Sequence, residues 1–334
     1  MALKPVPGFS LMKLAFACGW LTAVAALSPL TLSIEGDRSA IVALAGAQLR
    51  EQGVVALSAS CGVVGRGGAC ATLHADAQAH FSTLLDTAIA ADACLRAGES
   101  DLPAAELAEL RLALDEMSFE EVRRRGSRRY DLVVSPDGEA PGVAAWADAL
   151  EEALSWGRAV VSAATGCEAD QVRTLFSGCV ASLPGADDQG LHADGGAPGL
   201  FNVFMPLVPL PDDATGPTQF APGTHRDRSR ASRTAASEGA AVWAMADDAL
   251  LASPTPLEAG DLVIFDYRVL HRGLANRGTS FRPVLYATLA TSDDAADTVN
   301  FPPAPALANP PHFLGQPRKA INDAGPLPLP PGPA

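Results

Sequence analysis

The chain has 334 residues and a formal charge of −14 at pH 7, and 48% of its residues are hydrophobic. That apolar fraction is enough for a large buried core, which argues against a wholly disordered protein. The negative charge argues against binding to nucleic acid or to anionic lipid through the overall field, because both need clustered positive charge, and it suits a small ligand.

The N-terminal segment has the composition of a secretory signal peptide. MALKPVPGFSLMK carries lysines and no acidic residue, and an uncharged stretch follows from Leu14 to Leu32. The A-x-A pattern of Ala23 and Ala25 favours cleavage over retention as a membrane anchor. We therefore predict a signal peptide or membrane-proximal segment over residues 1–35 and a location in the secretory pathway or ER lumen, with membrane contact if the segment is retained. The alternative is an N-terminal helix of a cytoplasmic protein.

The following segment, residues 36–170, is expected to be mainly helical. Apolar residues recur at helical spacing from Ser39 until Gly53, and the short β-branched run VVALSA then predicts a strand. Amphipathic patterns predict three further helices, over residues 71–96, 103–117 and 144–164. Between them, EEVRRRGSRRYD is rich in arginine but has acidic neighbours, which favours a solvated turn or a salt-bridged face over an anion site.

The six cysteines do not have the spacing of a zinc site, because no C-x-x-C pair is present. Cys61 and Cys70 are close enough in sequence to form a disulfide. Buried free thiols are the favoured alternative, since unpaired cysteine behaves as a small apolar residue.

From Val172 onward the apolar runs become short and are separated by glycine and proline, as in GLFNVFMPLVPL and TQFAPGTH. This texture predicts a β-sandwich or jelly roll over residues 171–300. The stretch from Asp261 to Ala290 is interpreted as two apolar strands joined by a short polar turn that contains glycine. Residues 36–300 together are predicted to form one α+β domain, followed by a proline-rich tail over residues 301–334.

Three residues have the chemistry of an iron(II) site. His192 and Asp194 are two residues apart, so on a strand both side chains point to the same face, and His271 offers a second imidazole from a later strand. Two histidines and one carboxylate leave positions open for a co-substrate and O2, which suits non-haem Fe(II), whereas zinc more often has a third histidine or a thiolate. His225, in TQFAPGTHR, is the alternative third ligand, although it can instead hydrogen-bond the backbone of its turn. We favour His271 because Arg282 follows it on an apolar strand.

The H-x-D pattern alone is weak evidence for a metal site. The same tripeptide occurs at His74 and Asp76, inside a predicted helix, where side chains two residues apart point away from each other. The pattern at His192 and Asp194 differs because it lies in a predicted strand and loop and is followed by His271 and Arg282. A guanidinium at this place can hold the distal carboxylate of 2-oxoglutarate through two parallel hydrogen bonds.

The motifs HAD, NVFMPLVPL, TGPTQFAPGTH and GDLVIFDYRVLHRGLANRGTSFRPVLY, in this order within residues 172–290, resemble the phytanoyl-CoA dioxygenase-like family of Fe(II)/2-oxoglutarate-dependent oxygenases. The resemblance implies a double-stranded β-helix, a cupin-like jelly roll, with the metal in its mouth and helices of the N-terminal half bracing one sheet. It also implies that Fe(II) is bound by His192, Asp194 and His271.

The resemblance further implies that Arg282 binds 2-oxoglutarate. Asn202 and Thr218 are additional candidates for contacts with the co-substrate, against the alternative that each makes an ordinary hydrogen bond of a strand or turn. Arginine at 282 differs from the lysine of collagen-type prolyl hydroxylases, and Asp194 differs from the small residue of related halogenases.

The expected activity is that of a dioxygenase that consumes O2 and 2-oxoglutarate, hydroxylates a small-molecule or lipid-like substrate, and releases succinate and CO2. One alternative is a protein prolyl or lysyl hydroxylase of the secretory pathway. The other is a jelly-roll binding module without turnover.

Overall fold

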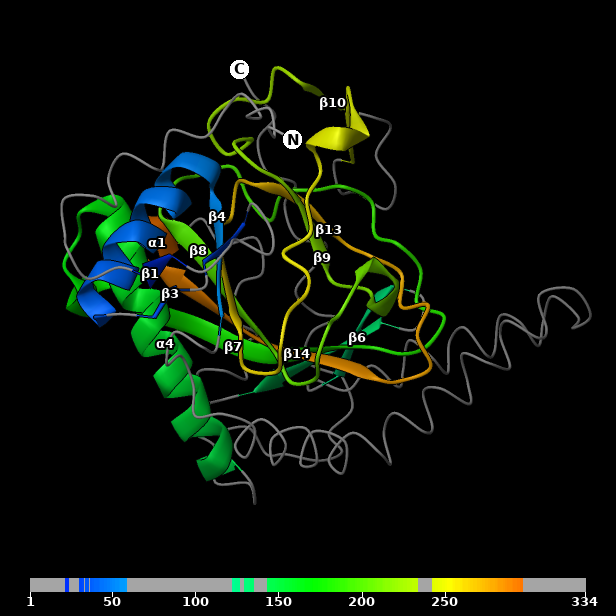
Figure 1. Ribbon diagram of the computed structural model, residues 1–334, viewed down its shortest axis with the longest axis horizontal. Coiled ribbons are helices and arrows are strands. Elements are labelled where there is room, and N and C mark those ends of the chain that lie inside the picture. The colour runs from blue at the N-terminus through cyan, green and yellow to red at the C-terminus, as the bar shows by residue number, and fades with distance from the viewer. Residues whose placement is uncertain are drawn as a thin grey trace, which may run out of the picture.

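The computed structural model describes residues 22–23, 30–32, 34–35, 37–58, 122–126, 129–134, 143–233 and 242–296. In this part of the chain two β-layers face each other, and two helices pack on the outer face of the larger layer (Figure 1). Several predicted features lie outside the described residues, namely the helices over 71–96 and 103–117, the tripeptide at 74–76, the cysteines at 61 and 70, and the tail over 301–334.

The larger layer is an eight-stranded sheet with the order β2-β4-β12-β8-β14-β7-β6-β5. Its strands, in that order, are Thr31–Leu32, Val54–Leu57, Leu262–Asp266, Leu200–Pro206, Arg282–Ala290, Arg173–Ser182, Arg129–Val134 and Val122–Gly126. Every neighbouring pair is antiparallel except β2 and β4, which are parallel.

The second layer is built from shorter pieces. Strands β9 (Thr218–Ala221) and β13 (Leu270–Gly273) pair with each other, and β10 (Ala231–Arg233) pairs with β11 (Trp243–Met245). Isolated bridges join these pairs through Leu191 to Trp243 and through His192 to His271. Two more short strands, β1 (Thr22–Ala23) and β3 (Ile34–Glu35), pair apart from both layers.

Helices α1 (Arg38–Gln52) and α4 (Val143–Thr165) lie against each other and against the large sheet (Figure 1). Both confirm the helices predicted from Ser39 to Gly53 and over 144–164. A Cβ on Gly46 would lie 2.6 Å from the Cβ of Ala163, so the glycine permits the close crossing of the two helices. Arg50 of α1 donates hydrogen bonds to the carbonyls of residues 163 and 164, which satisfies acceptors at the end of α4.

The helices explain why β4 and the first four residues of β12, Leu262 to Phe265, are apolar at every position. Val55 and Ile264 belong to the core beneath α1 and α4, whereas Val54 and Phe265 belong to the core between the two β-layers. A strand covered on both faces has no polar side, so it shows a continuous apolar run instead of alternation.

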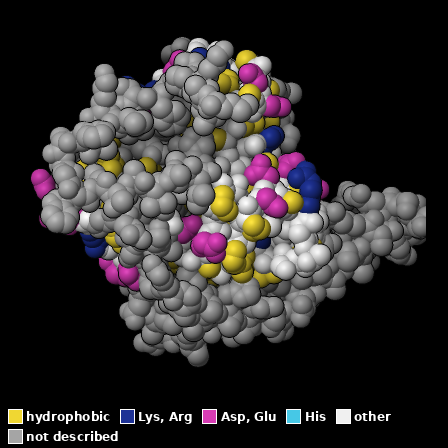
Figure 2. All heavy atoms as spheres, in the orientation of Figure 1, with side chains coloured by type: hydrophobic (Ala, Val, Ile, Leu, Met, Phe, Trp, Pro, Cys, Tyr) yellow, Lys and Arg dark blue, Asp and Glu magenta, His cyan; other side chains and the backbone are white. Residues whose placement is uncertain are grey.

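The remaining helical elements of the described residues are short. They are the 3-10 turns Ala169–Gln171, Asp213–Thr215 and Asp248–Leu250, and α5 (Asp293–Ala296). Within the described ranges, no helix combines the length and the hydropathy that crossing a membrane requires. The described side chains on the face shown in Figure 2 are of mixed type, with acidic groups at several separate places among hydrophobic and basic ones.

Two predictions were wrong. The stretch from Asp261 to Ala290 forms three strands instead of two, because the chain leaves the large sheet after β12, enters the second layer as β13, and returns as β14. The arginine-rich stretch EEVRRRGSRRYD is a β-hairpin, β5 and β6, at the edge of the large sheet, and its Arg129 is buried instead of solvated. The segment expected to be mainly helical therefore also supplies strands β4, β5 and β6.

Candidate metal centre

His192 and His271 are direct cross-strand neighbours in the second layer. The N–H of His192 donates to the carbonyl of His271 over 2.9 Å, and the N–H of His271 donates back over 2.7 Å. Such a reciprocal pair places both side chains on the same face of the layer. The two imidazole centroids are accordingly 4.5 Å apart.

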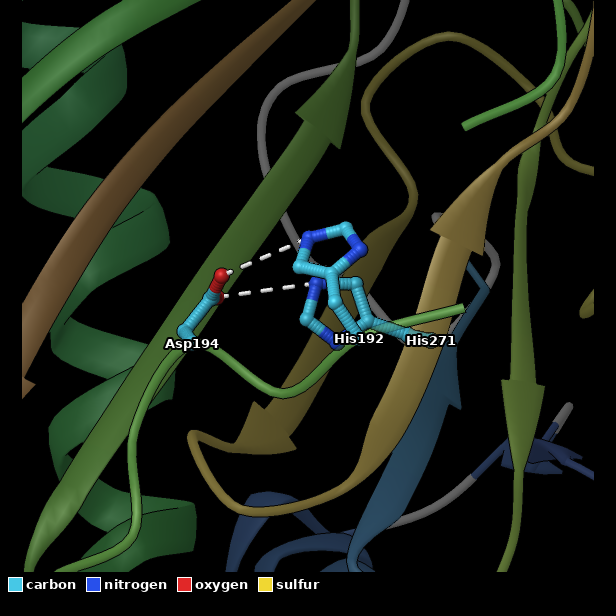
Figure 3. A group of neighbouring side chains, drawn as sticks. All are labelled: His192, Asp194 and His271. Carbon is cyan, nitrogen blue, oxygen red and sulfur yellow. Dashed lines mark ion pairs between the residues drawn. The ribbon is translucent and has the colours of Figure 1, made fainter. Parts of the chain in front are cut away.

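Asp194 completes the group from the loop that follows His192. Its N–H donates to the carbonyl of Tyr267 over 3.0 Å, which fixes the backbone of the loop against the end of β12. Its carboxylate faces both rings (Figure 3), with Oδ1 3.7 Å from Nε2 of His192 and Oδ2 3.6 Å from Nε2 of His271. The three residues can each offer one ligand atom, and these atoms all lie within 4.8 Å of one another.

Hydrogen bonds orient both rings for metal binding. Nδ1–H of His192 donates to the carbonyl of Gly190 over 2.8 Å, and Nδ1–H of His271 donates to the carbonyl of Val269 over 3.0 Å. A carbonyl can only accept, so each Nδ1 carries a proton, and Nε2, the atom that faces Asp194, is the one left to bind a metal. Two ligand atoms that bind one ion at about 2.1 Å and at right angles lie roughly 3 Å apart. The three side chains therefore fit Fe(II) if they move slightly closer together.

The surroundings keep His271 neutral. It is 5% exposed, and the rings of Phe265 and Phe220 lie 4.9 Å and 6.0 Å from its own. Burial lowers the pKa of His271 below its usual value, and the opposing influence of Asp194 does not reverse the shift. The neutral ring is the form that binds a metal.

Asn202 contacts the proposed ligand Asp194. From β8, its Nδ2–H donates to Oδ2 of Asp194 over 2.7 Å, and its Oδ1 accepts from the hydroxyl of Thr288 over 2.7 Å. Strands β8 and β14 pair Asn202 with Thr288, so the register of the sheet brings the two side chains together. The sequence analysis missed Thr288, because nothing local marks a threonine within an apolar strand as a partner of an asparagine far along the chain.

Arg282 lies in the large sheet, and Thr218 lies in the second layer. Arg282, 5% exposed, begins β14 and donates from its NH2 group to the hydroxyl of Ser182 over 2.6 Å. Its Nε is buried and has no hydrogen-bond partner among the described residues. Thr218 pairs with Gly273 while His271 pairs with Phe220, so Thr218 shares a sheet face with His271.

His225, the rival third ligand, lies elsewhere. Its Nε2 is 3.2 Å from the carbonyl of Arg50 at the end of α1, and a Cβ on Gly53 would contact its ring. It is absent from the group of ligand atoms found among the described residues. The expected alternative was a hydrogen bond to the backbone of its own turn, and the observed partner is instead a backbone carbonyl of α1.

Known families and structures are similar to this chain. A sequence model of the family "Phytanoyl-CoA dioxygenase (PhyH)" matches residues 49–284. A comparison with curated protein sequences finds no match. The epimerase SnoN, solved in complex with Fe3+, alpha ketoglutarate and nogalamycin RO, is 17% identical over 83% of this chain and 93% of its own, with a TM-score of 0.50.

Two further solved structures are more distant in shape. AviO1 from Streptomyces viridochromogenes Tue57 is 19% identical over 76% of this chain and 95% of its own, with a TM-score of 0.43. SnoK, a non-heme alpha ketoglutarate dependent carbocyclase, is 15% identical over 74% of this chain and 83% of its own, with a TM-score of 0.40. At such identities the likeness to SnoN shows the fold. Because the family match spans most of the chain and the described residues include a histidine and carboxylate group that fits iron, this chain belongs to the phytanoyl-CoA dioxygenase family and is an Fe(II)/2-oxoglutarate-dependent dioxygenase with a jelly-roll fold.

Proposed function

We propose that His192, Asp194 and His271 bind the Fe(II), and that the enzyme hydroxylates a small molecule with an apolar body. The observation that carries the metal assignment is the convergence of three ligand atoms within 4.8 Å, with the Nδ1 of both rings already engaged by carbonyls. Bound iron supplies the coupling of O2 reduction to decarboxylation of 2-oxoglutarate. One substrate C–H, one 2-oxoglutarate and one O2 then give one alcohol, one succinate and one CO2.

Arg282 is the proposed partner of the distal carboxylate of 2-oxoglutarate. Its guanidinium is buried, and its Nε has no hydrogen-bond partner in the part of the chain that the structure describes. A buried donor without a partner costs free energy, and a carboxylate would supply the missing acceptor. Hydrogen bonds of this charged kind contribute about 1.5–3 kcal/mol, which is enough to make Arg282 decisive for co-substrate affinity.

The apolar character proposed for the substrate rests on the aromatic side chains on the metal side of the second layer. Phe220 pairs with His271 and so points to the same face, and the rings of Phe220 and Phe265 lie 6.0 Å and 4.9 Å from that imidazole. Apolar groups beside a metal centre favour an apolar ligand over a highly charged one. A lipid-like molecule is one member of this class.

Metal and co-substrate binding can be tested by anaerobic titration with Fe(II) and 2-oxoglutarate, because their chelate gives a weak visible absorption band. Asp194→Ala, His271→Ala and Arg282→Ala are each expected to lose the band and substrate-dependent succinate formation. His225→Ala is the matched control and should keep most of both. Full activity in His271→Ala, or no band in folded wild type, would overturn the assignment.

Substrate class can be tested by incubating the purified enzyme with a metabolite extract, Fe(II) and 2-oxoglutarate, and by following products that gain one oxygen atom. An oxygenated apolar small molecule is the expected product class. A parallel incubation with peptides rich in proline and lysine tests the protein hydroxylase alternative. Succinate release with peptides alone would contradict the small-molecule proposal.

A further inference from the structure

The arginine-rich stretch brings a second guanidinium next to Arg282. Arg129, at the start of β6, is 2% exposed. Strands β6 and β7 pair Arg129 with Ser182, and strands β7 and β14 pair Ser182 with Arg282. The three residues therefore form one row across adjacent strands, with their side chains on the same face of the sheet.

Ser182 joins the two arginines. Its hydroxyl oxygen accepts a hydrogen bond from Nε of Arg129 over 2.9 Å and one from NH2 of Arg282 over 2.6 Å. A serine hydroxyl has two acceptor lone pairs and one hydrogen, so these bonds use its acceptor capacity and leave the hydrogen to donate. A donor between two cations is well placed to bind a carboxylate oxygen.

The row carries two buried positive charges. Among the described residues neither Arg129 nor Arg282 forms a salt bridge with a carboxylate. Burial lowers the pKa of Arg129 to about 10 and that of Arg282 to about 9, and the charge of Arg129 lowers the latter further. Both groups stay charged at neutral pH, and a bound anion would offset their desolvation and mutual repulsion.

The other donors of Arg129 bind backbone near the metal centre. Its NH2 donates to the carbonyl of Leu274 over 2.8 Å and to that of Asp187 over 3.3 Å, and its NH1 lies 3.4 Å from the carbonyl of Gly273. A Cβ on Gly273 would lie 2.6 Å from NH1, so glycine makes room for this guanidinium. Gly273 and His271 are both in β13, and Arg129 therefore ties the strand with the proposed metal ligand to the row that contains Arg282.

We propose that Arg129 is a positioning residue for the co-substrate, acting through Ser182 and through its charge. It holds the Ser182 hydroxyl beside Arg282 and adds a second positive charge, and the site thereby selects 2-oxo acids that carry a distal carboxylate. This inference rests on the proposed role of Arg282. Four of the five N–H groups of Arg129 are engaged by Ser182 and backbone carbonyls, so its assigned role is positioning and not direct contact with the co-substrate.

The test compares two ligands that differ in the distal carboxylate, 2-oxoglutarate and 2-oxopentanoate, by anaerobic titration of the Fe(II)-loaded protein at the visible band. Arg129→Gln is expected to weaken 2-oxoglutarate binding about 10-fold and to change 2-oxopentanoate binding less than about twofold. Arg129→Lys keeps the charge, so its affinity for 2-oxoglutarate should lie between those of wild type and Arg129→Gln. Arg272→Gln is the control, because Arg272 lies on β13 and bonds Gln219 instead of Ser182.

If Arg129→Gln weakens the binding of both ligands equally, the substitution causes a general structural defect and the proposal is overturned. Unchanged binding of 2-oxoglutarate would overturn it as well. If Arg129→Gln does not fold, Ser182→Ala decides, since removing the hydroxyl should produce the same selective loss. Retained selectivity in folded Ser182→Ala would then refute the inference. Failure of wild type to bind 2-oxoglutarate would instead refute the proposed role of Arg282, so the two failures are distinguishable.

Discussion

At the scale of single residues, the relay from Thr288 through Asn202 to Asp194 sets the orientation of the proposed carboxylate ligand. Loss of a partner that orients a metal ligand typically costs 10–100-fold in metal affinity. We expect Asn202→Ala to weaken binding of Co(II), a spectroscopic substitute for Fe(II), by about that factor. Thr288→Val should have a smaller effect in the same direction, and Thr288→Ser, which keeps the hydroxyl, should have almost none. Wild-type affinity in Asn202→Ala would show that the relay does not hold the carboxylate.

His225 offers a pH-dependent prediction that is independent of metal. Burial lowers the pKa of His225 below the usual value of 6.5, so on acidification the unfolded chain takes up a proton there before the folded protein does. The contribution of His225 to the free energy of unfolding is therefore full above about pH 6.5 and falls as pH drops from there toward the lowered pKa. Urea denaturation of the metal-free protein at several pH values should show a shallower acid loss in His225→Gln than in wild type. If the free energies of unfolding of the two proteins fall equally with decreasing pH, the pKa of His225 is the same in the folded and unfolded states.

At the scale of elements, the junction of α1 and β4 depends on Gly53. Its φ is 75°, and a Cβ there would lie 2.4 Å from both Nδ1 of His225 and Cγ2 of Val269. Val269 accepts the Nδ1 hydrogen bond of His271, so displacing it would also disturb the proposed metal centre. We expect Gly53→Ala to lower the free energy of unfolding by well over the roughly 1 kcal/mol of an ordinary left-handed position, and to weaken Co(II) binding.

Gly166 is the matched control for this substitution. Its φ is 82°, but a Cβ there would meet nothing within 4 Å. Gly166→Ala should therefore show the backbone strain alone, about 1 kcal/mol, with unchanged Co(II) affinity. If urea denaturation gives equal losses in the free energy of unfolding for the two variants, the contacts of the new Cβ at Gly53 do not destabilise the protein.

Local patterns in the sequence were sufficient to predict α1, α4 and β4, because periodicity and a terminal glycine are properties of neighbouring residues. They were insufficient for β12 to β14. A strand that changes sheets has the same kind of apolar sequence as one that stays in its sheet. Only the pairing of β13 with β9 shows that β13 belongs to the second layer.

The same limit applies to the candidate site. His192, Asp194 and His271 were predicted together because their types and order are specific, and the structure brings them into one group. The partners Thr288 and Ser182 were not predicted, because each depends on the register between strands far apart in the chain. Arg129 was misinterpreted because acidic neighbours in sequence suggested solvent, whereas the sheet edge turns its side chain inward.

At the scale of the whole molecule, the fold holds one end of the buried positive row of the large sheet against the end of β13, the strand that carries His271. Arg129 connects the two, since it bonds both Ser182 of the large sheet and the carbonyl of Leu274 just beyond β13. Without an anion the row is a local cost to folding, because both guanidinium groups are desolvated and neither forms a salt bridge among the described residues, although the charges of Asp188 and Asp187 partly offset that of Arg129. The stability of the whole chain should therefore respond to the co-substrate.

Replacement of Arg282 by methionine should separate stability from ligand response. Removing one buried, uncompensated charge is expected to raise the free energy of unfolding of the ligand-free protein by about 1 kcal/mol. Wild type should gain about 2.7 kcal/mol from 2-oxoglutarate at 100 times its dissociation constant, in the presence of a non-reactive divalent metal, because ligand that binds the folded state alone shifts the equilibrium by mass action. Arg282→Met should gain little under the same conditions. Its free energy of unfolding should therefore be higher than that of wild type without ligand and lower than that of wild type with ligand. If Arg282→Met is not more stable than wild type without ligand, the positive row is already compensated in the ligand-free protein.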